Sequence, residues 1–216
     1  MIEVNLNNLW KELPPDVKLV AVSKYYPVEA IERAYKAGQR VFAESRPQDF
    51  AVKVEQLPKD IEWHFIGHLQ TNKLKLVLPY ASLVQSVDSR HLLDSREKWG
   101  KDNDKVVQVL LEIHIGAEQT KQGFAEEEAL DILFNADKFP HVRFRGLMAM
   151  ATNTDDESIV DADFARIDSF MAYLVDLFPE LEGFDQLSIG MSGDYKIALR
   201  HGATMVRIGS AIFAEQ

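Results

Sequence analysis

The sequence predicts a closed (β/α)₈ barrel, the TIM-barrel fold, formed by a single domain. Short runs rich in Val, Ile, Leu and Phe recur along the 216 residues, segments with helical periodicity separate them, and no long linker interrupts the alternation. Alternating strands and helices form parallel sheets with right-handed crossovers, and eight such units in succession favour a closed barrel over an open sheet. The chain is near the short end for this fold, so we expect one domain over residues 1–216.

The predicted strands are the apolar runs themselves, each bounded by polar or glycine-containing segments. The active face of a (β/α)₈ barrel lies at the carboxyl ends of its strands, so the residues that end these runs are the first candidates for a site. In chain order the strands cover 17–23, 40–44, 62–67, 82–87, 106–115, 144–150, 186–191 and 204–208.

The predicted helices lie between the strands. In the first of them, Ile31, Ala34 and Tyr35 share one helical face, and Gly38 follows as a stop signal. We expect a further helix near 5–13, ahead of the first strand, to cap the bottom of the barrel. The helices between strands are predicted at 28–36, 47–56, 69–78, 90–99, 126–136, 163–178 and 194–201.

Composition narrows the possible functions. The chain has no cysteine, which excludes disulfides, thiolate nucleophiles and Cys-ligated metals. Its net charge of −10 argues against general binding of nucleic acid. No run approaches the roughly 18 apolar residues of a membrane span, and the amino terminus lacks the pattern of a signal peptide. We therefore expect a cytoplasmic protein without a membrane or nucleic-acid partner, and no visible patch demands more than a monomer.

Two segments near the end of the chain predict a phosphate site. Segment 187–194 is an apolar run that ends in small residues such as Ser192, and segment 204–210 ends in Gly209 and Ser210. Backbone N–H groups at a helix start bind phosphate well when serine hydroxyls assist and glycine permits close approach. In a (β/α)₈ barrel phosphate often binds after strands 7 and 8, where both segments fall.

Lys24 ends the first predicted strand and faces the same mouth of the barrel as the phosphate segments. A lone lysine here is more often solvated, but a neutral lysine amine forms a Schiff base with an aldehyde. Lysine and phosphate site together predict pyridoxal 5′-phosphate. Two interpretations of Arg207 stay open: a salt bridge at the barrel rim, or a partner for the pyridine nitrogen. Because arginine stays protonated, such a partner accepts no hydrogen bond and leaves that nitrogen unprotonated.

Other polar residues give weaker signals. His64 and His68 have the spacing of a helical metal pair, but their segment reads as a strand, so we do not expect zinc. Ser23, Ser188 and Ser192 lack a G-x-S-x-G elbow, which argues against a serine hydrolase.

Several short motifs carry a resemblance to a known family. They are Ala21-Val22-Ser23-Lys24, the block from Trp63 to Lys73, Gln85-Ser86-Val87-Asp88, Gly146-Leu147-Met148, Gly190-Met191-Ser192-Gly193-Asp194 and Val206-Arg207-Ile208-Gly209. With these motifs the chain resembles the pyridoxal phosphate homeostasis protein family, single barrels similar to the amino-terminal domain of bacterial alanine racemase. The resemblance runs from about Val17 to Phe213.

The resemblance implies roles for the candidate residues. Lys24 looks like the Schiff-base lysine, Arg207 like the residue facing the pyridine nitrogen, and Ser192, Gly209 and Ser210 like phosphate ligands. Some positions depart from the family pattern. They are Ala43 and Ser45 in place of glycine and asparagine, Tyr25-Tyr26 where a second lysine often follows the first, and Ala214 and Gln216 in place of a terminal glycine and arginine.

The family resemblance implies a carrier of pyridoxal phosphate that buffers the cofactor or delivers it to apo-enzymes. Alanine racemase needs a second domain, whereas this chain ends just after strand 8, so we expect an exposed cofactor suited to exchange. Two enzymes remain as alternatives: a low-activity racemase, with Lys24 as one base and Tyr25, Tyr26 or His68 as the other, and a lysine-dependent aldolase acting on a sugar phosphate. Lys73 and Lys121 are the alternative lysines for a covalent adduct.

Overall fold

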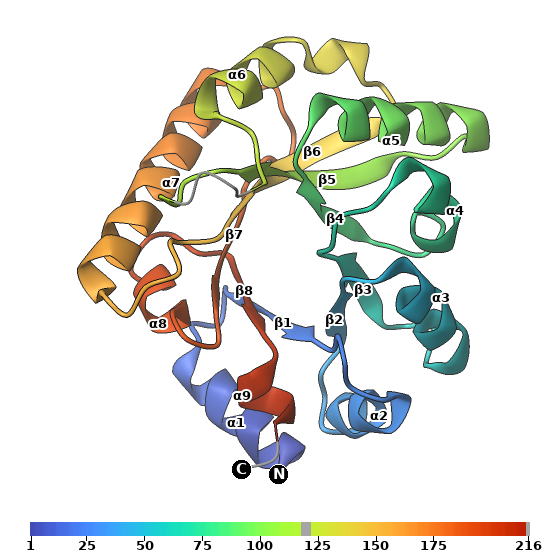
Figure 1. Cartoon of the computed structure of the whole chain (residues 1–216), viewed down its shortest axis with the longest axis vertical. Helices are drawn as coiled ribbons and strands as arrows, with labels where there is room; N and C mark the ends of the chain where they lie inside the picture. The colour runs from blue at the N-terminus through green and yellow to red at the C-terminus, as the bar shows by residue number, and fades with distance from the viewer. Residues whose placement is uncertain (118–121, 215–216) are drawn as a thin grey trace.

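The computed structural model describes residues 1–117 and 122–214 and forms a closed barrel of parallel strands in the order β1 to β8 (Figure 1). Each strand pairs with the next in the chain, and β8 closes the ring against β1 through a register that runs from Lys18 opposite Met205 to Ala21 opposite Ile208. The predicted (β/α)₈ fold is therefore confirmed. Lys121 and Gln216 lie outside the described residues.

The predicted strands are all present, with small changes at their ends. Among the strand starts, that of β6 differs most, since this strand begins at Val142, two residues before the predicted start at 144. There Val142 and Phe144 are buried while Arg143 between them is exposed, so the apolar pattern is interrupted where the strand starts. The strands are β1 Lys18–Val22, β2 Val41–Glu44, β3 Glu62–Phe65, β4 Leu83–Val87, β5 Val107–Ile113, β6 Val142–Ala149, β7 Gln186–Met191 and β8 Met205–Ile208.

Helices cover the outside of the barrel (Figure 1). The predicted bounds of α2 and α3 are confirmed, but α7 begins at Glu157, six residues before its predicted start at 163. The Asp156 side chain caps it by accepting a 2.9 Å hydrogen bond from the Ser158 N–H. The helical segments that follow β1 are α2 Val28–Lys36, α3 Pro47–Gln56, η1 Thr71–Lys73, α4 Leu74–Val77, α5 Arg90–Asn103, α6 Glu126–Phe134, η2 Ala136–Lys138, α7 Glu157–Leu177, α8 Tyr195–Ala198 and α9 Ser210–Phe213.

The helix ahead of β1 is present as α1, Ile2–Glu12, but the prediction that it caps the bottom of the barrel is wrong. It packs beside α2 and α9 in the outer layer of helices. Asn5 Nδ2 donates a 3.0 Å hydrogen bond to the Ile212 carbonyl, and the Tyr195 hydroxyl donates one of 2.6 Å to Glu12. The helices after β7 and β8 have only four residues each, so α1 covers the apolar surface that they leave.

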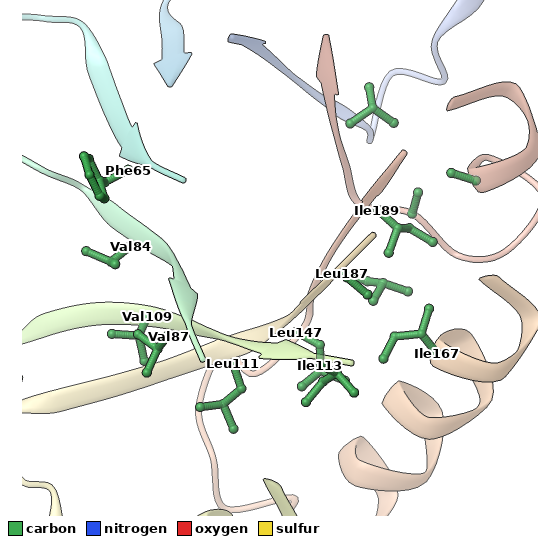
Figure 2. Close-up of a cluster of buried hydrophobic side chains, with 14 of the residues drawn as sticks. Phe65, Val84, Val87, Val109, Leu111, Ile113, Leu147, Ile167, Leu187 and Ile189 are labelled. Atoms are coloured by element: carbon green, nitrogen blue, oxygen red, sulfur yellow. The ribbon is translucent and has the colours of Figure 1, made fainter. Parts of the chain in front are cut away.

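Two apolar layers hold the barrel together. The larger lies between strands and helices, where the outward side chains of β5 to β7 meet Ile167 of α7 (Figure 2). The smaller fills the barrel interior and includes Val20, Leu110 and Met148. The interior also buries polar side chains, His64, Gln85, Ser188 and Arg207 among them. In the described part of the chain, no helix combines the length and the apolar character needed to span a membrane.

Candidate functional site

All five predicted site residues line one cavity of about 410 Å³ at the carboxyl ends of the strands. Lys24 follows β1, Ser192 follows β7, Arg207 lies in β8, and Gly209 and Ser210 follow β8. Parallel strands bring these ends together although the residues span most of the sequence. Their cofactor-binding roles stay a prediction, but all five residues lie around the same cavity.

Hydrogen bonds fix the position of Ser23, the residue that precedes Lys24. The carbonyl of Ser23, the preceding residue, accepts a 2.9 Å hydrogen bond from Lys53 Nζ, and the Ser23 hydroxyl donates one of 2.5 Å to Glu44 Oε1. Tyr25, the following residue, has a φ of 72°, so the chain turns sharply away after Lys24. The Lys24 side chain is half-buried, forms no ion pair within residues 1–117 and 122–214, and has its Nζ 5.7 Å from the centre of the Tyr25 ring.

The buried pair beneath Lys24 consists of Glu44 and Lys53. Lys53 Nζ lies 2.6 Å from Glu44 Oε1, and both side chains are almost fully buried. Burial raises the pKa of Glu44, and the hydrogen bonds from Lys53 and Ser23 oppose that rise. The sequence reasoning missed Lys53, although a lysine between Phe50 and Val54 on the inward face of a helix was a signal that could have found it.

The two loops after β7 and β8 meet at the Ser192 hydroxyl. Ser192 Oγ accepts hydrogen bonds from the backbone N–H groups of Gly209, at 3.3 Å, and Ala211, at 3.4 Å. Gly193 leaves open space beside them, since a Cβ there would meet no atom within 4 Å. Two backbone N–H groups therefore converge on the Ser192 hydroxyl oxygen at the edge of the cavity, and convergent backbone donors are what an anion site requires.

Arg207 lies at the floor of the cavity, inside the barrel. Its Nη1 donates to the carbonyl of Ser188 at 2.8 Å and to the Ser188 hydroxyl at 2.6 Å, while Nη2 donates to the Ala149 carbonyl at 3.1 Å. The interpretation as a rim salt bridge is wrong, because the side chain is buried and forms no ion pair with a carboxylate of the described residues. Burial lowers the pKa of Arg207 to about 10, so it remains charged at neutral pH.

A second acidic group, Glu112 of β5, faces the barrel interior near Arg207 and was also missed. Burial raises the pKa of its carboxyl to about 7, the negative charge of Asp88 adds to the rise, and Arg207 opposes it. Glu112 is the single charged residue of β5 and lies within its buried run from Val109 to Ile113, which was the signal for an inward-facing charge.

The structure separates the remaining candidates. Tyr25, Tyr26 and Ser45 line the cavity, and the ring of Tyr26 packs against Phe213 with centres 4.8 Å apart. His68 is not among the lining residues, and its Nδ1 lies 3.3 Å from Asp88 Oδ2. Three more residues lie away from the lining: Lys73 in η1, Ala43 buried inside the barrel, and Ala214 at a separate hollow near Met1.

His64 and His68 have different surroundings, as the strand interpretation predicts. His64 is buried in the barrel interior, with Nδ1 2.8 Å from Gln85 Nε2, while His68 lies beyond the end of β3. Across the described residues, no three His, Asp or Glu side chains are grouped in a way that could hold a metal ion.

Comparison with known proteins defines the class first. The profile described as alanine racemase, N-terminal domain, matches residues 1–216. The alanine racemase of Clostridium difficile 630 superposes with a TM-score of 0.79 at 17% identity; the match covers 100% of this chain and 56% of the racemase, and it shows a shared fold. The barrel is thus of the alanine racemase N-terminal-domain type.

More similar relatives narrow the class. The pyridoxal phosphate homeostasis protein of Pasteurella multocida (strain Pm70) is 39% identical over 200 residues, covering 91% of this chain and 85% of the relative. That of Aquifex aeolicus (strain VF5) is 36% identical over 205 residues, covering 92% and 87%. PipY of Synechococcus elongatus PCC7942, solved with PLP bound, superposes with a TM-score of 0.91 at 33% identity over 99% of this chain and 100% of PipY. The chain belongs to the pyridoxal phosphate homeostasis protein family, as its motifs predict.

Proposed function

We propose that this protein binds pyridoxal 5′-phosphate in the cavity lined by Lys24, Arg207 and the Ser192 loops, and that it buffers the cofactor or delivers it to apo-enzymes. The observation that carries the proposal is the single cavity that joins an amine, a buried guanidinium and a cluster of anion-binding donors. The relatives named pyridoxal phosphate homeostasis proteins and the PLP-bound PipY support it.

The residues present fit this cofactor. The phosphate would accept hydrogen bonds from the Gly209 and Ala211 N–H groups that now converge on Ser192, with Ser210 beside them. Ile66, Met148 and Met150 give the cavity the apolar walls that a flat ring requires. The volume of about 410 Å³ lies within the range of small-molecule sites, roughly 300–1,000 Å³.

Each charged residue has a distinct task in this proposal. With the cofactor bound, Lys24 would hold it by condensation of its amine with the aldehyde, and the aldehyde oxygen would leave as water with the two protons of the amine nitrogen. Arg207 would lie toward the pyridine nitrogen; because it only donates hydrogen bonds, it would favour the unprotonated ring. The cofactor supplies an electrophilic aldehyde, and an unprotonated ring withdraws electrons less strongly, which suits holding the cofactor better than catalysis.

We infer a carrier in place of an efficient enzyme, acting in the cytoplasm as a monomeric single domain without nucleic acid or membrane partners. A weak racemase is the second candidate, because Tyr25 and Tyr26 both line the cavity beside Lys24 and could supply the second acid or base. Turnover of L- or D-alanine by the cofactor-loaded protein, followed by chiral chromatography, distinguishes the two: sustained racemisation contradicts the carrier.

The proposal is tested by adding pyridoxal 5′-phosphate to the purified protein, recording its visible spectrum, and locating the reduced adduct by mass spectrometry after borohydride treatment. We expect one pyridoxyl group on Lys24 and a complete loss of that adduct in Lys24→Ala, with the barrel still folded by circular dichroism. A half-buried lysine at the mouth contributes little to the core.

Lys73→Ala is the matched control, since Lys73 lies outside the cavity lining and its variant should keep the adduct. An adduct that persists in Lys24→Ala moves the covalent site to another lysine. A wild-type protein that stays colourless and unmodified contradicts the cofactor altogether.

A further inference from the structure

A continuous hydrogen-bonded chain crosses the inside of the barrel below the cavity. It starts at Arg207, whose Nη1 donates to Ser188 Oγ at 2.6 Å. The Ser188 hydroxyl donates to Gln85 Oε1 at 2.6 Å, and Gln85 Nε2 lies 2.8 Å from His64 Nδ1. His64 Nε2 lies 3.0 Å from Glu62 Oε1, at the amino-terminal end of β3. The chain thus connects the cavity floor with the opposite end of the barrel.

The direction of every hydrogen bond in this chain is fixed by its two ends. A guanidinium only donates, so Ser188 Oγ must accept from Arg207 and turn its own proton toward Gln85. An ionised carboxylate only accepts, so His64 Nε2 must carry the proton shared with Glu62, which leaves Nδ1 of a neutral ring as an acceptor. Gln85 is the link that satisfies both, with its oxygen toward Ser188 and its nitrogen toward His64.

The surroundings agree with a neutral His64 between an acceptor and a donor. Burial lowers the pKa of His64, and the hydrogen bond from His64 holds the pKa of Glu62 at about 2. Lys18 Nζ, 2.7 Å from Glu62 Oε1, balances the carboxylate at the barrel surface. The Gln85 side chain is fully buried, and the Met205 sulfur is its only further partner among the side-chain hydrogen bonds of the described residues.

We propose that Gln85 is a positioning residue: through Ser188 it fixes the Arg207 guanidinium at the floor of the cavity, and through His64 it links that guanidinium to Glu62 at the other end of the barrel. No other buried side chain of the described residues bonds both Ser188 and His64. Loss of the Gln85 amide leaves the Ser188 proton without its acceptor, so the hydroxyl turns and the Arg207 contact loosens. The inference rests on the proposed function only in its effect on the cofactor.

The test uses the ¹⁵N-labelled full chain without cofactor. In wild type we expect NMR to show His64 with a protonated Nε2 and an unprotonated Nδ1, and slowly exchanging N–H signals from the Arg207 guanidinium. In Gln85→Leu we expect exchange of those Arg207 protons to become about tenfold faster, the size of effect that follows from loosening one charge-assisted hydrogen bond. We also expect about tenfold weaker binding of pyridoxal 5′-phosphate and a shifted visible maximum.

Gln85→Glu serves as the rescue variant. A carboxylate at this position still accepts from Ser188, but it requires a proton on His64 Nδ1 as well, so His64 becomes doubly protonated between two carboxylates. We expect both ring nitrogens to show protonated shifts and Arg207 exchange to return toward the wild-type rate. Exchange as fast as in Gln85→Leu contradicts the proposal.

Gln39→Leu is the matched control. Gln39 is also buried and also makes two hydrogen bonds, to the carbonyls of Leu19 and Val41, but it has no contact with the chain. If Gln85→Leu changes Arg207 exchange no more than Gln39→Leu does, Gln85 has a structural role only and the proposal fails. Should Gln85→Leu not fold, Gln85→Met keeps an unbranched side chain of similar length without the amide and has to show the same faster exchange, with Ser188 left in place.

The two proposals fail separately. A wild-type protein with the expected His64 and Arg207 signals that binds no pyridoxal 5′-phosphate contradicts the proposed function and retains the positioning role. A protein that binds the cofactor with identical spectra in wild type and Gln85→Leu, and with unchanged Arg207 exchange, contradicts the positioning role and retains the function.

Discussion

Two buried polar networks support the two charged residues of the cavity, and they are built differently. Beneath Lys24, outside the barrel, Glu44 and Lys53 form an ion pair in which both side chains are buried from solvent. We call this pair the outer network. Beneath Arg207, inside the barrel, the neutral groups of Ser188, Gln85 and His64 separate the guanidinium from Glu62, which is 38% exposed.

The difference concerns where charge is buried. The outer network buries both charges of the Glu44–Lys53 pair, and Glu44 Oε2 has no hydrogen-bond partner among the described residues, so its stability depends on the pair remaining intact. In the interior network, neutral dipoles surround the one buried positive charge, that of Arg207, and the carboxylate of Glu62 lies at the surface. The side chains that link the two ends therefore carry no net charge. Removal of a single group should therefore cost most in the outer network and least at the exposed end of the inner one.

The largest effect is expected from Lys53→Met. This substitution leaves the Glu44 carboxylate buried without its cation, and breaking a buried pair from one side costs about 3–5 kcal/mol in the free energy of unfolding. Urea denaturation at neutral pH measures it. The double variant Glu44→Gln with Lys53→Met removes both charges and should recover most of the loss. A single-variant loss below about 1 kcal/mol, as exposed pairs show, would contradict the comparison.

A smaller effect on the free energy of unfolding is expected from Glu112, which lies near Arg207 at the cavity end of the interior network. Its pKa is raised from an ordinary 4.5 to about 7, mainly by burial, so the folded state binds a proton that the unfolded state has lost. The resulting stabilisation is complete below pH 4.5 and disappears as the pH rises to about 7.

Glu112→Gln should remove this pH dependence. Relative to the variant, wild type should lose about 3 kcal/mol between those pH values, measured by urea denaturation along the pH series. Parallel stability curves for the two proteins would mean that Glu112 titrates alike in the folded and unfolded states.

The smallest effects are expected at the exposed end of the interior network, where Glu62→Gln is the larger of two. The hydrogen bond from His64, followed by that from Lys18, lowers the pKa of Glu62 to about 2, so its stabilisation is present above pH 4.5 and disappears as the pH falls toward 2. Because the carboxylate is 38% exposed, solvent screens it and we expect a loss of only about 1 kcal/mol at pH 7.

Lys18→Met is the companion variant, with an expected loss below about 0.5 kcal/mol. Thermal unfolding at pH 7 and pH 3 measures both substitutions. A loss for Glu62→Gln as large as that for Lys53→Met would show that the two networks do not differ as proposed.

The order and kind of the secondary-structure elements could be predicted because each strand is an apolar run and each helix has a periodic face. The face of Ile31, Ala34 and Tyr35 predicted α2, and α3 begins at Pro47, a residue type that favours the first position of a helix. The start of α7 was missed because a local cap at Asp156, outside the apolar pattern, begins the helix. The position of α1 was missed because nothing local to its sequence shows that α8 and α9 are too short to cover the barrel.

The candidate site was predicted as a set of strand ends, and those residues do meet in one cavity. Its supporting residues were not predicted. Lys53 lies nine positions from its partner Glu44, Gln85 lies 103 positions from Ser188, and no spacing rule connects either pair. His64 was considered only as a possible metal ligand, whereas it is an internal link of a hydrogen-bonded chain.

The sequence by itself determined the barrel and the set of strand ends that line one cavity, because periodicity and strand-end position are local properties of the chain. Only the tertiary structure decided how the buried charged groups are paired. Arg207 donates to neutral acceptors, Glu44 pairs with Lys53, and burial raises the pKa of Glu112 to about 7. The physical reason is that burial and pairing are set by neighbours from distant strands, and the closing of the barrel alone brings those neighbours together.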